Sequence, residues 1–169
     1  MIGVDMTPAM LDRARANQEK LGLENVDFRL GEIEHLPVAD DSVDVIISNC
    51  VINLSPDKPQ VFRETYRVLR SGGKIAVSDI VTSGPLPEEI IASLSAWAGC
   101  IAGAIDVEDY ITAVEATGFV DVRLEPVYFS SEMVDEALEE LGEAAEMAGD
   151  RAEEVYKSVF SAKITARKP

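Results

Sequence analysis

The segment VDVIISNCVINLSPDKPQ, residues 43–60, contains the patterns that decide the fold. Residues 43–48 are largely β-branched and apolar on both faces, which is typical of a central parallel strand that is covered on two sides. The run that begins with SPDKPQ at residue 55 and continues to SGG at residues 71–73 predicts a capped helix that stops at the glycines. The segment therefore predicts a strand, a turn and a helix, and it places Cys50 at the turn.

The alternation of strands and helices continues on both sides of this segment. We expect further strands at residues 1–5, 26–30, 74–81, 120–129 and 158–168, and further helices at residues 8–21, 88–99, 107–117 and 132–154. Strands that alternate with helices predict an α/β fold with a doubly wound, mainly parallel sheet. The strands at residues 1–5, 43–48 and 74–80 should lie in its interior. The last two strands should form an antiparallel pair at the edge.

The composition is that of one globular domain, which we place at residues 1–169. The net charge of −16 argues against electrostatic binding to nucleic acid or to an anionic membrane. No apolar run approaches the ~18 residues that a membrane span requires, and the N-terminus lacks the pattern of a signal peptide. Two cysteines form no disulfide framework, so we expect a reducing, cytoplasmic environment.

Three local signals point to one kind of α/β protein. Asp5 ends the first predicted strand, where a carboxylate can accept hydrogen bonds from both hydroxyls of a ribose. GEIEHLP, residues 31–37, and SGGKIAVSDIV, residues 71–81, follow it along the chain. In this order, the signals resemble those of class I S-adenosylmethionine-dependent methyltransferases. The resemblance implies that residues 31–37 lie along the adenine of the cofactor. Another doubly wound protein is the alternative.

Within that superfamily, the match narrows to one activity. GVDMTPAML at residues 3–11, SNCVINLSPDK at residues 48–58 and a second cysteine, Cys100, closely resemble arsenite methyltransferases, and the resemblance covers residues 1–169. It implies that the thiolates of Cys50 and Cys100 are the catalytic ligands of trivalent arsenic, a soft ion that prefers sulfur to oxygen. The alternative is that each cysteine is a small apolar packing residue.

The resemblance also assigns residues to the cofactor, S-adenosylmethionine. Asp5 would bind the ribose and Met6 would cover one face of the adenine. Ile33 and Glu34 would border the adenine. The neighbours of Cys50 would touch the amino-acid end of the cofactor; these are Asn49 and Val51. The alternatives are that Asp5 is a helix-entry acid beside Thr7 and that Glu34 is a solvated loop charge.

The chain departs from the family pattern at its beginning. A class I methyltransferase begins with a strand and a glycine-rich loop that approaches the cofactor, whereas residue 1 already matches the start of the second strand. We therefore expect an N-terminally incomplete methyltransferase domain, truncated before its second strand. The absent strand belongs at the centre of the sheet. Its two neighbours must pair with each other, pair with another chain, or stay exposed, which opens a route to self-association.

Three functions follow from these observations. The first is the transfer of a methyl group from S-adenosylmethionine to thiolate-bound trivalent arsenic, presented as a small thiol adduct. The second is methylation of another small molecule, such as a quinone precursor, with incidental cysteines. The third is a non-catalytic fragment that folds and binds the cofactor poorly. The two thiols separate the first function from the second, because As(III) needs both sulfurs at one cavity, within about 4 Å of each other.

Overall fold

The computed structural model describes residues 1–84, 101, 103–130, 132 and 158–169. Its elements are β1 (Ile2–Asp5), α1 (Pro8–Leu21), β2 (Asp27–Leu30), β3 (Val43–Asn49), the 3₁₀ turn η1 (Ile52–Leu54), α2 (Lys58–Val68), β4 (Leu69–Thr82), α5 (Val107–Ala116), β5 (Val120–Tyr128) and β6 (Val159–Arg167). This order confirms the α/β class. The helices expected at residues 88–99 and 132–154 lie outside the described residues.

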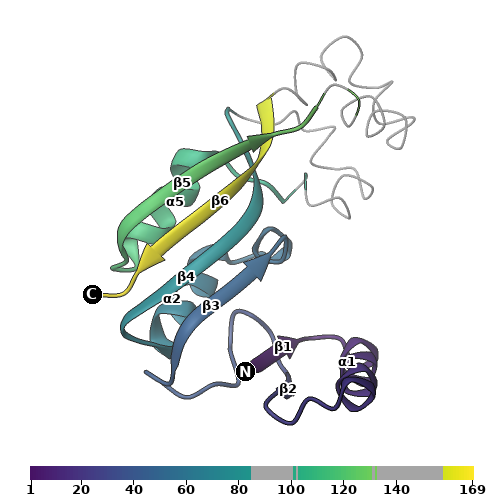
Figure 1. Ribbon diagram of the computed structural model, residues 1–169. Coiled ribbons are helices and arrows are strands. Elements are labelled where there is room, and N and C mark those ends of the chain that lie inside the picture. Colours follow the sequence, from purple (N-terminus) through teal and green to yellow (C-terminus); the bar gives the residue numbers. More distant parts are fainter. Residues whose placement is uncertain (85–100, 102, 131, 133–157) are drawn as a thin grey trace.

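The strands form two sheets instead of one (Figure 1). In the smaller sheet, β1 and β2 run parallel. The larger sheet has the order β3–β4–β6–β5, with β3 parallel to β4 and with β6 antiparallel to both β4 and β5. The antiparallel pairing of the last two strands is therefore confirmed, and β6 lies between β4 and the edge strand β5.

The expectation that three strands lie in the interior of one sheet is correct for β4 and wrong for β1 and β3. Among the described strands, β1 pairs only with β2, and β3 pairs only with β4. The physical reason is that no described strand lies between them, so each keeps one unpaired edge. β3 is also not covered on both faces, because Val45 is 57% exposed and Ile47 is 80% exposed.

The main core lies between the larger sheet and helices α2 and α5, which cover the same face of it (Figure 1). Phe62 of α2 and Tyr110 of α5 are fully buried and meet edge to face, with ring centroids 5.3 Å apart. Ile75 of β4 and Ile164 of β6 belong to the same buried cluster. Burial of such a side chain stabilises the fold by about 1.5–3 kcal/mol, so this packing holds both helices against β4.

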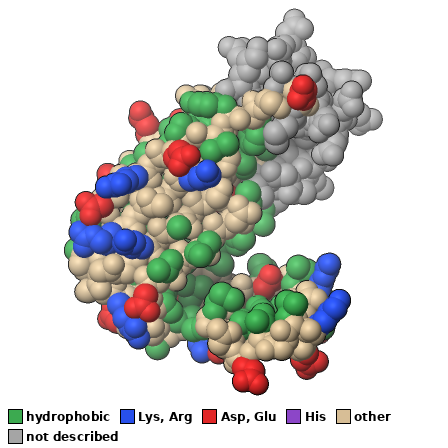
Figure 2. All heavy atoms as spheres, viewed as in Figure 1, with side chains coloured by type: hydrophobic (Ala, Val, Ile, Leu, Met, Phe, Trp, Pro, Cys, Tyr) green, Lys and Arg blue, Asp and Glu red, His purple; other side chains and the backbone are tan. Residues whose placement is uncertain are grey.

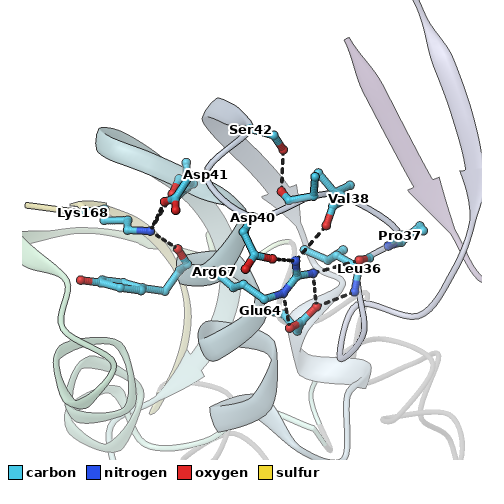
Figure 3. A network of polar contacts seen from close by, with 12 residues as sticks. Leu36, Pro37, Val38, Asp40, Asp41, Ser42, Glu64, Arg67 and Lys168 are labelled. Atoms are coloured by element: carbon cyan, nitrogen blue, oxygen red, sulfur yellow. Dashed lines mark hydrogen bonds and ion pairs between the residues drawn. The ribbon is translucent and has the colours of Figure 1, made fainter.

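A polar network fastens the loop after β2 to α2 (Figure 3). The Arg67 guanidinium donates to the carbonyl oxygens of Leu36 at 3.0 Å and Val38 at 2.9 Å. It also pairs with Glu64 at 2.7 Å and Asp40 at 2.5 Å. The hydrogen bond from Arg67 is the main reason that the pKa of the Glu64 carboxyl is lowered. Arg67 thus fixes the loop that carries the predicted adenine contacts.

Candidate functional site

A cavity of about 690 Å³ separates the unpaired edges of β1 and β3. Figure 2 shows it as a hollow with hydrophobic side chains on both walls. Its lining residues include Ile2, Val4, Ile33, Ile46, Ile47, Asn49, Val51, Phe62, Ile75 and Val77. The volume and the largely apolar walls are those of a site for a small organic molecule.

Asp5 lies at the carboxyl end of β1, beside the start of the loop that follows β2. The two strands are parallel with Asp5 opposite Leu30, and the N–H of Gly31 donates to the carbonyl oxygen of Asp5 at 3.1 Å. Oδ1 of Asp5 accepts the N–H of Thr7 at 2.8 Å. This bond is what a helix-entry acid would make, and the carboxylate is only half-buried. Met6, the next residue, is 69% exposed.

Gly31 allows the loop after β2 to fold back on itself. A Cβ at this position would lie 2.6 Å from Cδ of Pro37 and 3.6 Å from a methyl group of Val4, so the close approach excludes a side chain. Two residues further on, Ile33 lines the cavity. The sharp turn at Gly31 therefore brings the loop alongside both β1 and the cavity.

Glu34 contacts the segment that joins η1 to α2 and the first turn of α2. The Ser55 hydroxyl hydrogen-bonds to its carboxylate, and the Gln60 side chain donates to its carbonyl oxygen at 3.0 Å. Because Ser55 is buried and Glu34 is half-buried, Glu34 is not simply a solvated loop charge. Its assignment to the adenine stays a prediction.

Cys50 follows β3 in a left-handed backbone conformation, with φ 55°. This conformation costs a non-glycine residue roughly 1–2 kcal/mol, so the surroundings must hold it. The N–H of Cys50 donates to the carbonyl oxygen of Ser78 on β4 at 2.8 Å. The half-buried side chain packs against the buried pair Ile80 and Val159. Its neighbours Asn49 and Val51 both line the cavity, whereas Cys50 itself is not one of the lining residues.

Cys100, the other predicted arsenic ligand, lies outside the described residues. Ile101, the next residue along the chain, packs against the same buried pair, Ile80 and Val159, as Cys50 does. Ala104 packs there as well. The structure therefore brings the described residues that follow Cys100 to the same part of β4 as the turn that carries Cys50.

A buried polar cluster lies beside the Cys50 turn, and the sequence patterns did not predict it. Asp79 on β4 is fully buried, and its carboxylate accepts the N–H groups of Ile80 at 3.1 Å and Asn53 at 3.2 Å. The Tyr110 hydroxyl donates to it at 3.4 Å. Burial raises the pKa of Asp79 to about 6, and burial likewise lowers the pKa of nearby Lys58. The signal in the sequence was a lone acid inside the apolar run KIAVSDIV.

Among the described residues, none of the helices combines the length and the hydrophobicity that a passage through a bilayer requires.

Comparison with known proteins gives one consistent family. A family model described as "Methyltransferase domain" matches residues 1–149. The arsenite methyltransferase of Halobacterium salinarum is 46% identical over 169 residues, which is 100% of this chain and 40% of that protein. The human arsenite methyltransferase is 41% identical over 131 residues, 72% of this chain and 35% of that protein. The chain thus spans less than half the length of these curated relatives.

Solved structures agree with this assignment. The crystal structure of an arsenic(III) S-adenosylmethionine methyltransferase from Chlamydomonas reinhardtii superposes with a TM-score of 0.69 at 34% identity, covering 98% of this chain and 54% of that one. A phosphoethanolamine N-methyltransferase from Haemonchus contortus gives a TM-score of 0.72 at 20% identity, covering 99% of this chain and 43% of that one, and supports the fold alone. The match over residues 1–149 shows that this chain belongs to the methyltransferase domain family, as the sequence signals predicted.

Proposed function

We propose that the protein transfers a methyl group from S-adenosylmethionine to trivalent arsenic held by thiolates. The observation that carries the proposal is the position of Cys50. It lies at the carboxyl end of β3 between two residues that line the cavity, in a chain that matches an arsenite methyltransferase along its whole length. Ligands of open α/β sheets bind beyond the carboxyl ends of the strands.

On the arsenic side, the ligands in this proposal are Cys50 and Cys100. Thiolates suit As(III), the substrate, because both are soft. The packing of Cys50 and Ile101 against the same pair on β4 and β6 supports a common site for the two thiols. Two protein thiolates would leave one position on the arsenic for a small thiol. The lone pair of the arsenic would then point away from the three sulfurs. No general base is required, since the attacking lone pair carries no proton.

On the cofactor side, the described residues fit S-adenosylmethionine. The carboxylate of Asp5 ends β1, where ribose hydroxyls can donate to it. Ile33, Asn49 and Val51 line the cavity, and Met6 offers an exposed thioether to an aromatic ring. When bound, the cofactor supplies a methyl group attached to a positively charged sulfur, and the neutral thioether is a good leaving group. The task of the protein is then to hold the two reactants aligned, and the apolar walls exclude water from between them.

We also propose that the protein associates with itself through the unpaired edges of β1 and β3 and acts in the cytoplasm. The exposed apolar side chains of Val45 and Ile47 on β3 and of Met1 support the association. A paired strand edge is more stable than one that only water covers. A reducing compartment would keep both cysteines as thiols.

A methyl-transfer assay tests the proposed function. The protein is incubated with S-adenosylmethionine, glutathione and arsenite, and S-adenosylhomocysteine and methylated arsenic are quantified by chromatography. We expect both products to form together and to be lost in Cys50→Ser. Cofactor binding without As(III) binding would contradict the arsenic proposal and favour another small acceptor. Absence of both would favour a non-catalytic fragment.

A further inference from the structure

Asn53 fastens the turn after Cys50 to the carboxyl end of β4. The residue is fully buried in η1, three positions after Cys50. Its backbone N–H donates to Oδ2 of Asp79 at 3.2 Å, and its side-chain amide donates to the carbonyl oxygen of Ile80 at 2.6 Å. Lys58 Nζ donates to the Asn53 carbonyl oxygen at 3.2 Å. Because its partners Asp79 and Ile80 belong to a central strand, Asn53 has little freedom to move.

Gly103 is buried against the carbonyl group of Asn53. A Cβ at position 103 would lie 2.2 Å from the carbonyl oxygen of Asn53 and 3.0 Å from its carbonyl carbon. Both obstacles are backbone atoms, and Asn53 is held by β4 from the other side. A side chain at position 103 would therefore push Gly103 and Ala104 away from the Cys50 turn.

The two segments share a second point of contact. Ile101 and Ala104 pack against Ile80 and Val159, and so does Cys50. The backbone contact between Gly103 and Asn53 is thus one of two features that set how far the segment after Cys100 lies from Cys50. It is the more restrictive one, because backbone atoms in van der Waals contact cannot rotate away as side chains can.

We propose that Asn53 and Gly103 are positioning residues for the arsenic site: their contact sets the spacing between the Cys50 turn and the described residues that follow Cys100. The inference rests on the proposed function, because a site with two thiolates depends on this spacing. The sulfurs must approach to about 4 Å for one arsenic atom to bind both. The second thiolate then binds intramolecularly at a high effective concentration, which falls steeply when the geometry is disturbed.

Gly103→Ala tests this proposal, with Gly73→Ala as the matched control. Gly73 is also buried, and a Cβ there would also meet a backbone atom, 2.8 Å from the carbonyl oxygen of Arg70, but near the other end of β4. Two quantities are measured on the full chain. One is the affinity for arsenite, from the absorbance of the arsenic–thiolate bonds. The other is the effective concentration of the Cys50–Cys100 thiol pair, from its disulfide equilibrium with glutathione.

We expect Gly103→Ala to lower both quantities by about tenfold or more, while Gly73→Ala lowers stability but leaves both within about twofold. If Gly103→Ala does not fold, Asp79→Asn is measured in its place. An amide at position 79 cannot accept the same set of hydrogen bonds as the carboxylate, so Asn53 is held less firmly. We expect Asp79→Asn to lower the arsenite affinity and the effective concentration of the thiol pair by about threefold. A folded Gly103→Ala that keeps both values would overturn the inference. A wild type that does not bind arsenite contradicts the proposed function alone, because the disulfide equilibrium still reports the spacing.

Discussion

Asp79 is a single buried acid on which three elements converge. Asn53 of η1 and Tyr110 of α5 donate to its carboxylate, and Lys58 of α2 is the nearby cation. Burial raises the pKa of Asp79 to about 6, above the ordinary value of 3.8. The raised pKa means that the folded state favours the protonated acid over a wider range of pH than the unfolded chain does. The stability contributed by this proton is fully present below pH 3.8 and is lost as the pH rises through about 6.

The pH dependence of stability should therefore change in Asp79→Asn. Between pH 4 and pH 7 the wild type should lose about 2 kcal/mol more than Asp79→Asn, because one pKa unit corresponds to about 1.4 kcal/mol and most of the rise from 3.8 to about 6 falls in this range. The free energy of unfolding, measured in urea at several pH values, checks this. Parallel profiles for the two proteins would show that Asp79 does not titrate in this range.

At the cofactor site, Asp5 is the residue whose role is easiest to measure. Asp5→Ala removes a charged hydrogen-bond acceptor and should weaken S-adenosylmethionine binding by about 1–3 kcal/mol. Asp12→Ala on the solvent-exposed part of α1 is the control and should leave the affinity unchanged. Calorimetric titration measures both. Equal affinities for the wild type and Asp5→Ala would refute the ribose assignment.

Helix α2 is the element that holds the loop after β2 in place, and Arg67 makes most of its contacts (Figure 3). Arg67→Met should keep the aliphatic packing but remove the Arg67 hydrogen bond to the Val38 carbonyl oxygen. The Leu36 carbonyl oxygen would keep only the N–H of Val38 as a donor. We expect a loss of about 1–3 kcal/mol in the free energy of unfolding. Arg63→Met is the control on the same helix. Arg63 makes an exposed hydrogen bond to Oε1 of Gln60 at 2.8 Å and an exposed ion pair with Asp57 at 3.8 Å, and it donates to no carbonyl group of the loop. Exposed contacts of this kind contribute less than about 1 kcal/mol.

Chemical denaturation of both variants measures the difference. If Arg63→Met costs as much as Arg67→Met, the loop is not anchored by Arg67 and the network in Figure 3 contributes little.

At the level of elements, local patterns in the sequence predicted most of the described structure. The apolar runs located β3 and β4, and Gly22 marked the end of α1, where its φ of 65° is the left-handed conformation of a C-cap. The contacts of Asp79 with Asn53, and of Asn53 with Gly103, were not predictable. They join residues 26 and 50 positions apart, and their formation depends on how η1 and the segment after position 100 pack on β4.

On the scale of the whole molecule, β1 and β3 do not pair with each other, and a hollow lies between them (Figure 2). Exposed edges are one of the three outcomes expected for a sheet without its central strand. The pattern in residues 43–48 indicates a strand with two apolar faces, but it carries no information on which strand lies beside it. The sequence pattern therefore predicts that Ile47 is buried, whereas its side chain is 80% exposed in the structure. An apolar edge of this kind favours association.

Ile47→Lys should consequently reduce self-association without a large loss of stability. Leu21→Lys is the control, since Leu21 is 69% exposed at the end of α1, which lies outside the lining of the hollow. Light scattering over a range of protein concentrations gives the mass of each variant. A monomeric wild type at all concentrations, or an equal effect of Leu21→Lys, would contradict association through β3.

We propose that this methyltransferase domain holds As(III) through Cys50 and Cys100. The most direct measurement is a titration of the wild type, Cys50→Ser and Cys100→Ser with arsenite under reducing conditions, alongside the melting temperature of each protein. Our account predicts that either substitution lowers the arsenite affinity by about tenfold or more while the melting temperature changes little, because a single thiolate loses the chelate advantage. An unchanged affinity in either variant, with only the modest loss of stability that altered packing causes, would contradict it.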